Sequence, residues 1–170
     1  MSTSTEIRAA QDRVAEVFRR KPRAAFSTVR GTASVADGLL CHYRQGSHEA
    51  AMDMGTVLGG AGVAPTPGFY FRAAVAGCAA IGIKMTAARE GMEIEAINVA
   101  IEMDFDDSAL LGMGTNPAAP LETRLVISLR SREDGENLKA MVDRALAADP
   151  FLLALRDSQK VITAFALEPG

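Results

Sequence analysis

Apolar side chains recur at helical spacing near the start of the chain and predict a helix over Thr5–Arg20. Thr3 and Glu6 fit a capping box at its N-terminus, and Pro22 stops it. The apolar stripe consists of Ile7, Ala10, Val14, Val17 and Phe18. The basic run RRKPR at the end of the helix complements the helix dipole, and this interpretation is preferred to a nucleic-acid-binding patch.

The pattern changes to short extended segments over Ala24–Asp53. The dipeptide Asp37-Gly38 is the strongest two-residue signal for a β-hairpin, and a second turn falls near Gln45-Gly46. These signals predict a three-stranded antiparallel meander.

A glycine-rich loop, MGTVLGGAGVAPTP, follows the meander. It lacks the lysine and hydroxyl spacing of a phosphate cradle, so we expect its glycines to let the chain turn closely around another group. Pro67 then opens a helix that runs to about Glu90, with Gly91 as its stop. The apolar run Ala73–Ile83 is shorter than the ~20 residues of a membrane span, which predicts a buried helix of a soluble protein.

The second half of the chain begins with clean alternation of apolar and polar residues over Ile97–Asp106, typical of a half-buried strand whose carboxylates face water. A second alternating strand, ETRLVISLRS, leads to a capping box formed by Ser131 and Asp134. We expect a helix after it, with the stripe Leu138, Met141, Val142, Ala145 and Leu146. A short helical turn after Asp149-Pro150 and a closing strand, KVITAFAL, complete an α+β domain.

Composition narrows the class of protein. A chain of 170 residues with 48% apolar and 23% charged residues suits one globular domain. The formal net charge of -3 offers no general attraction to nucleic acid or acidic membranes. Two cysteines cannot form a disulfide framework, and the first residues have no apolar signal core, so a cytoplasmic protein with reduced thiols is predicted.

Cys41, His42 and His48 raise the hypothesis of a metal site in the meander. Neighbouring residues of a strand point to opposite faces, so Cys41 and His42 do not easily share one ion. We prefer to interpret them as ordinary strand residues. We therefore expect neither a metal nor another cofactor in this protein.

A second candidate is the tripeptide Ala76-Gly77-Cys78, in the middle of the apolar helix that follows the glycine-rich loop. With the Asp37-Gly38 hairpin before it and the alternating strand after it, this block resembles the OsmC/Ohr family of osmotically inducible and organic hydroperoxide resistance proteins. The resemblance covers residues 24–170 as a single OsmC-like domain, and residues 1–23 form an N-terminal helical extension. It implies antiparallel strands around a long buried central helix, an intertwined homodimer with the thiol site at its interface, and a thiol-dependent peroxidase.

The family pattern matches this sequence incompletely. Cys78 stands at the position of the cysteine that attacks peroxides. The second cysteine of the family falls on Asp149, and its glutamate falls on Gly68. Its arginine corresponds to Arg30. The resemblance therefore implies Cys78, Arg30 and Asp149 as candidate catalytic residues.

The local sequence gives Cys78 little help to ionise. The start of its helix lies eleven residues back, and Arg72 and Lys84 project about 120° away from its face at 100° per residue. Apolar surroundings raise a thiol pKa, so Cys78 is expected to be inert unless the fold brings a cation to it, for which Arg30 is the candidate.

Asp149 has three interpretations. As a neighbour of Cys78 it would raise the thiol pKa further, or it could accept a proton or hold an arginine. Otherwise it simply turns the chain before Pro150, the interpretation favoured from sequence. Cys41 could replace the missing cysteine only with its Cα within ~7 Å of that of Cys78.

Three hypotheses of function follow. The first is a one-cysteine reductase of organic hydroperoxides, with Cys78 as nucleophile and an external thiol as reductant. The second is a non-catalytic module that keeps the family's dimer-interface pocket and binds a small apolar ligand there. The third, ranked lowest, is the metal-binding protein. The cleft of the second hypothesis would be lined by Phe69, Tyr70, Phe71, Met52, Met54 and Met85.

Overall fold

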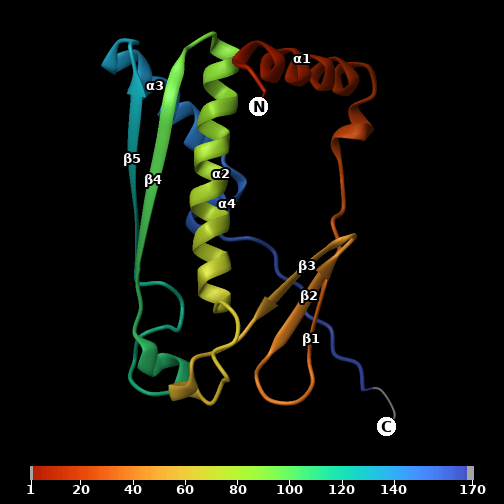
Figure 1. The fold of residues 1–170 in the computed structure, drawn as a ribbon. Coiled ribbons are helices and arrows are strands. Elements are labelled where there is room, and N and C mark those ends of the chain that lie inside the picture. The colour runs from red at the N-terminus through yellow and green to blue at the C-terminus, as the bar shows by residue number, and fades with distance from the viewer. Residues whose placement is uncertain (1, 168–170) are drawn as a thin grey trace.

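The computed structural model describes residues 2–167 and begins with helix α1, Ser4–Arg20 (Figure 1). The Thr3 hydroxyl accepts a hydrogen bond from the Glu6 N–H at 3.2 Å, and the Glu6 carboxylate accepts one from the Thr3 N–H at 2.7 Å. The predicted capping box is therefore confirmed. The 3-10 turn η1, Pro22–Ala25, ends the helical region, and an extended connector leads away from it.

Three antiparallel strands follow the connector in the order β1-β2-β3. They are β1 (Thr32–Val35), β2 (Cys41–Gln45) and β3 (His48–Met52). The turns between them contain Gly38 and Gly46, both at positive φ, where a glycine is the least strained residue. The predicted meander and both of its turns are confirmed.

Helix α2, Pro67–Glu90, begins at the Thr66 cap and ends at Gly91, which has a φ of 75°. Its buried residues are Val75, Ala79, Ile83, Thr86, Ala87 and Ala88, and it packs against α3, β4, α1 and α4. The opposite face is open, with Ile81 63% exposed, so the helix is half-buried within one chain. Its length and hydropathy would also suit a membrane span, but a core helix passes the same test, and one face here lies in the core.

Strands β4 (Ile94–Asp104) and β5 (Glu122–Ser131) form a long antiparallel ribbon beside α2 (Figure 1). Between them lies the 3-10 turn η3, Asp107–Leu111. Helix α3, Gly135–Ala147, follows β5. The buried core joins α2, β4 and α3 through Ile83, Ala87, Ile94, Met141 and Ala145, and Ile127 and Leu129 of β5 pack against it.

The predicted capping box of α3 is wrong, because Asp134 alone caps the helix. Its Oδ1 accepts hydrogen bonds from the N–H groups of Glu136 and Asn137. Ser131 remains the last residue of β5, and its hydroxyl donates to the Glu93 carbonyl at the neighbouring strand.

The predicted closing strand is also not formed. Helix α4, Pro150–Arg156, is followed by an extended segment over residues 158–167 that pairs with no strand. Val161 and Phe165 in this segment are 82% and 90% exposed. An alternating sequence makes a strand only where another strand pairs with its backbone groups, and within one chain residues 158–167 are paired with none.

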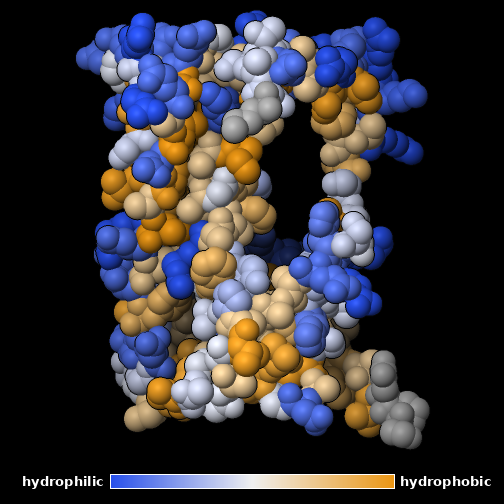
Figure 2. Space-filling view, in the orientation of Figure 1, coloured by the Kyte–Doolittle hydropathy of each residue, from blue (hydrophilic) through white to orange (hydrophobic). Residues whose placement is uncertain are grey.

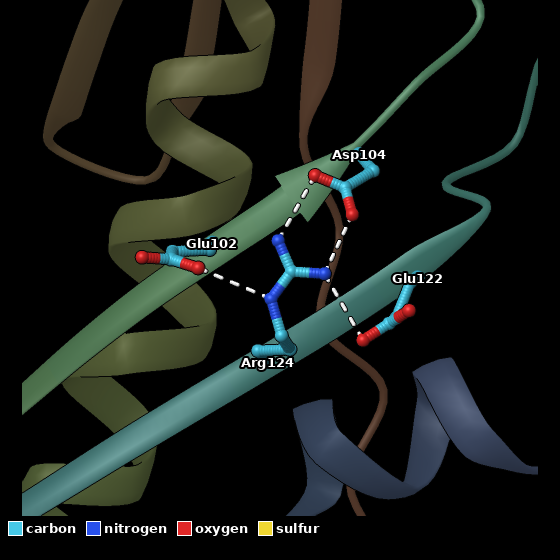
Figure 3. A network of polar contacts seen from close by, with 4 residues as sticks. All are labelled: Glu102, Asp104, Glu122 and Arg124. Atoms are coloured by element: carbon cyan, nitrogen blue, oxygen red, sulfur yellow. Dashed lines mark hydrogen bonds and ion pairs between the residues drawn. The ribbon is translucent and has the colours of Figure 1, made fainter.

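The exposed face of the ribbon carries the predicted carboxylates. Arg124 of β5 pairs with Glu102 and Asp104 of β4 and with Glu122 of its own strand (Figure 3). The Asp104 and Glu102 contacts are hydrogen-bonded, at 3.0 Å between Arg124 Nη2 and Asp104 Oδ1 and 3.1 Å between Nε and Glu102 Oε2. The group is a surface ion-pair network across the ribbon.

An opening lies between α2 and the connector that joins α1 to β1 (Figure 2). α1 starts beside one end of α2 and runs sideways from it, and the meander lies at the other end (Figure 1). The connector between α1 and β1 runs apart from α2, and Figure 2 shows an opening between them whose α2 side is largely apolar.

Candidate functional site

Cys78 lies in the middle of α2, half-buried, where α2 meets the start of α4. Gly82 stands one turn further along the helix. A Cβ at Gly82 would lie 3.8 Å from Oδ2 of Asp149, so this carboxylate rests directly against α2. The fold therefore brings together Cys78 and Asp149, two of the three candidate residues.

Asp149 is the N-cap of α4. Its Oδ1 accepts hydrogen bonds from the N–H groups of Phe151 at 3.0 Å and Leu152 at 2.7 Å. The residue is only 3% exposed, and its Oδ2 is buried with no hydrogen-bond partner among the described residues. Asp149 therefore does turn the chain before Pro150, as predicted, but only one of its oxygens is needed for that role.

The thiol of Cys78 faces this carboxylate in a close polar contact that falls short of a formed hydrogen bond. Burial raises the pKa of Cys78, and the carboxylate of Asp149 raises it further through its accepting oxygen and its charge. The backbone N–H of Phe151 acts against these effects. Burial and the carboxylate of Asp149 therefore both favour the protonated thiol over the thiolate.

Arg30, the third candidate, lies elsewhere in the chain. It lines a cavity of about 710 Å³ on the meander, together with residues such as Thr32, Tyr43 and Arg44. All residues that line this cavity belong to the meander and its approach, and none comes from α2 or α4. Within one chain, the expected cation is therefore not delivered to Cys78.

The cations of α2 itself also point elsewhere. Lys84 donates a hydrogen bond from Nζ to the Ile94 carbonyl at 2.6 Å. The guanidinium of Arg72 lies beside Gly68, where an added Cβ would be 3.2 Å from its Nη1. The sequence-based expectation that neither cation serves Cys78 agrees with these contacts.

Cys41 lies on β2, paired with Val35 and Met52, while His42 is on the exposed face of the same strand. Over residues 2–167, no group of three or more His, Cys, Asp or Glu side chains is placed to hold a metal ion. The two adjacent residues alternate in burial as a strand requires.

The aromatic cleft of the second hypothesis is divided between two ends of α2. The Tyr70 hydroxyl donates to the Ala51 carbonyl at 3.1 Å, and Phe69 packs edge-on against Tyr70. Met85 instead lines an apolar groove of about 400 Å³ between α1 and α2. Fifteen residues of helix separate Tyr70 from Met85, which is about 22 Å at 1.5 Å per residue. In one chain the six residues do not enclose a single cleft.

Asp53 is a buried carboxylate that the sequence analysis did not single out. It ends the meander, is 1% exposed, and accepts hydrogen bonds from the N–H groups of Met54 at 2.8 Å, Ala61 at 3.1 Å and Val63 at 3.2 Å. These donors, led by Val63, lower the pKa of Asp53. An aspartate directly before a glycine-rich loop was the available signal, because its side chain can accept hydrogen bonds from nearby backbone.

The glycine-rich loop wraps around Asp53 as tightly as its sequence suggested. A Cβ at Gly60 would lie 1.9 Å from the Met54 carbonyl oxygen, so no larger residue fits there. The Asp53 N–H also donates to the Pro65 carbonyl. The loop thereby holds Pro65 next to the end of β3 and fixes where α2 begins.

Comparison with known proteins assigns this fold. The family described as OsmC-like protein matches residues 59–164, more than half of the sequence, and the chain belongs to this family. No functionally curated protein matches the sequence significantly.

Solved structures show the same fold at low sequence identity. An OsmC-like protein from Mycoplasma pneumoniae has a TM-score of 0.65 at 12% identity, covering 77% of this chain and 89% of its own. An organic hydroperoxide resistance protein from Legionella pneumophila has a TM-score of 0.54 at 20% identity, covering 78% and 92%. One from Elizabethkingia anophelis, with thiocyanate bound, has a TM-score of 0.56 at 16% identity, covering 78% and 91%.

Proposed function

We propose that this protein is a one-cysteine, thiol-dependent reductase of organic hydroperoxides, with Cys78 as nucleophile. The observation that carries the proposal is the buried carboxylate of Asp149, whose free Oδ2 faces the only thiol of α2. Two relatives of the same fold are named for resistance to organic hydroperoxides, which supports this substrate class. The proposed biological role is therefore protection against peroxide stress.

Asp149 supplies the proton chemistry that a protonated thiol needs. As the Cys78 sulfur attacks the terminal oxygen of ROOH, its proton passes to Asp149, and the O–O bond breaks. The leaving alkoxide takes that proton and departs as ROH. Cys78 ends as a sulfenic acid, Cys78–SOH, and Asp149 ends as a carboxylate.

An external thiol completes the cycle, because the position of the family's second cysteine is Asp149. A thiol R′SH attacks the sulfenic sulfur, a disulfide Cys78–S–S–R′ forms, and the hydroxyl leaves as water. A second thiol then releases Cys78–SH and R′SSR′. Such a cycle suits a compartment that keeps thiols reduced, such as the cytoplasm.

We also propose the intertwined homodimer, with a second copy covering the open face of α2. Ile81 and Phe71 on this helix are 63% and 42% exposed, and the α2 side of the opening beside it is largely apolar (Figure 2). The extended segment at residues 158–167 would gain a strand to pair with in such a dimer. Arg30 of the second copy is the cation proposed to reach Cys78.

One observation favours the second hypothesis, the non-catalytic module. Both burial and Asp149 raise the pKa of Cys78, which lowers the amount of thiolate available for attack. A protein with this site and an apolar dimer interface could bind a small apolar ligand without turning it over.

Trapping the sulfenic acid separates the two functions. Reduced protein is mixed with an equimolar alkyl hydroperoxide, and a sulfenic-acid-specific dione is located by peptide mass spectrometry. The reductase predicts labelling of Cys78 in the wild type and in Cys41→Ser, and none in Cys78→Ser. Lack of labelling in the wild type under these conditions, with peroxide unconsumed, would rule out the reductase and leave the binding module.

Mixed dimers test the part of Arg30. Arg30→Ala and Cys78→Ser are each expected to be inactive, and they are unfolded and refolded together. Random pairing of a two-chain site gives intact sites at about a quarter of all positions, so activity should return to about that fraction. Activity that stays absent in the mixture, although both variants refold as dimers, would contradict a shared site.

A further inference from the structure

The free oxygen of Asp149 is unexplained by the reduced protein. Oδ1 already caps α4, whereas Oδ2 is buried and makes no hydrogen bond with any residue of 2–167. A buried acceptor without a donor is destabilising, and folded proteins rarely keep one. Its place beside Cys78 suggests a donor that arrives only when the sulfur changes chemically.

Oxidation of Cys78 supplies such a donor. The thiol faces the carboxylate but falls short of a formed hydrogen bond to Oδ2. A sulfenic acid adds one oxygen to the sulfur and presents an O–H group, which extends further and donates more strongly than S–H. Because residue 82 is a glycine, no side chain at this position lies between α2 and Oδ2 of Asp149.

We propose that Asp149 holds the sulfenic acid of Cys78 by a hydrogen bond from its O–H to Oδ2 and thereby protects it from over-oxidation. This inference rests on the proposed function. Over-oxidation is the reaction Cys78–SOH + ROOH → Cys78–SO₂H + ROH, in which the sulfur loses two further electrons and the O–O bond breaks. The species that attacks the second peroxide is the ionised sulfenate, which has a free electron pair on sulfur. The carboxylate of Asp149 accepts a hydrogen bond from the neutral sulfenic acid and repels the sulfenate anion, so it disfavours the ionised form.

Protection of the sulfenic acid matters in this protein because residue 149 is an aspartate and not a second cysteine. Where a second thiol condenses with the sulfenic acid, a disulfide ends its exposure to peroxide. In this chain Asp149 stands there instead, so the sulfenic acid waits for an external thiol. Asp149 thus acts as a stabiliser of the intermediate in the place of a partner that would consume it.

The test compares Asp149→Asn and Asp149→Ser with the wild type, all in a Cys41→Ser background. Asparagine and serine both cap helices, so α4 keeps its cap, while neither offers a carboxylate oxygen at the Oδ2 position. Asp143→Asn is the matched control, since Asp143 is an exposed residue of α3 that pairs with Lys139. It removes the same charge without touching Cys78.

Each protein is oxidised with a large excess of hydrogen peroxide, which reaches even a slow thiol in time. Samples are quenched with the dione at intervals, and mass spectrometry gives the ratio of sulfinic to sulfenic Cys78. Loss of a charge-assisted hydrogen bond corresponds to on the order of tenfold, so conversion to the sulfinic acid should be about ten times faster in both Asp149 variants. Asp143→Asn should match the wild type.

Equal conversion rates in the wild type and the two Asp149 variants would overturn the inference. That result is distinct from failure of the proposed function, which would appear as slow formation of the sulfenic acid with stoichiometric alkyl hydroperoxide. Circular dichroism shows whether each Asp149 variant is folded. If Asp149→Asn is unfolded, the comparison is made with Asp149→Ser.

Discussion

Asp53 and Asp149 are two buried aspartates of similar exposure and opposite chemistry. Asp53 has both oxygens occupied by backbone N–H groups of the glycine-rich loop. Asp149 uses one oxygen for two N–H groups of α4 and leaves the other free beside a thiol. Donors lower the pKa of the first carboxyl, whereas the second raises the pKa of its neighbour.

The difference separates a structural carboxylate from a chemical one. A fully paired carboxylate is stable as an anion and holds backbone in place. A half-paired one keeps an accepting position that a reacting group can use. Burial alone does not distinguish them, since both are at most 3% exposed. Four predictions test this contrast.

Gly60→Ala should break the Asp53 region most strongly. The new Cβ would fall 1.9 Å from the Met54 carbonyl oxygen, a backbone atom that cannot move away cheaply. We expect a loss of roughly 2–4 kcal/mol in the free energy of unfolding, measured by urea denaturation. Gly55→Ala is the control, because nothing lies near its Cβ and its φ of -65° suits alanine. Equal losses in both variants would show that the loop is not packed around Asp53.

Asp53→Asn should lower Tm by roughly 5–10 °C at pH 7, because an amide nitrogen faces N–H donors in place of an oxygen. The folded pKa of Asp53 is lowered, so its stabilising effect is present above the unfolded pKa and is lost as pH falls through the folded value. The wild type and the variant should therefore converge below about pH 4. A Tm difference that is constant from pH 7 to pH 3 would argue against a paired carboxylate.

Asp149→Asn should change two reactions of Cys78 in opposite directions. Removing the carboxylate lowers the thiol pKa, so alkylation by iodoacetamide at pH 7 should become several times faster. Peroxide reduction also needs the proton acceptor, so the ratio of the peroxide rate to the alkylation rate should fall roughly 10- to 100-fold.

The control for this ratio is Asp143→Asn, which should leave both rates unchanged. A parallel rise of both rates in Asp149→Asn would mean that the carboxylate acts on Cys78 only through its charge. Stopped-flow measurements of both reactions on the same protein samples give the ratio directly.

Arg124→Gln should have the smallest effect, although it removes the cation from among three carboxylates (Figure 3). The network is exposed and screened by salt, so we expect Tm to fall by no more than about 3 °C, and by less at high salt. Calorimetry at two salt concentrations checks this. A fall as large as that of Asp53→Asn would mean that surface charge holds the ribbon together.

Much of the fold could be predicted from local patterns. The capping residue Thr3, the helix start at Pro67, the turn at Asp37-Gly38 and the stop at Gly91 each act over a few residues. Local signals failed where two residues competed for one role, as when Asp134 rather than Ser131 capped α3. They also failed at residues 158–167, where alternation alone cannot form a strand without a neighbouring one.

The candidate site was predictable only in part. Resemblance to the OsmC family placed Asp149 beside Cys78, although 71 residues of sequence separate them. The sequence could not show that one oxygen of Asp149 caps α4 while the other stays free. Nor could it show that Arg30 lies on the meander, away from α2 and α4.

The sequence by itself determined the helices, the meander, the long ribbon and the single cysteine at the centre of the apolar helix. These features depend on spacing and on residues close along the chain. Only the tertiary structure decided the environment of Cys78. A thiol pKa and an unpaired oxygen depend on groups that meet across elements, and α4 brings its carboxylate to α2 only when the whole domain has folded.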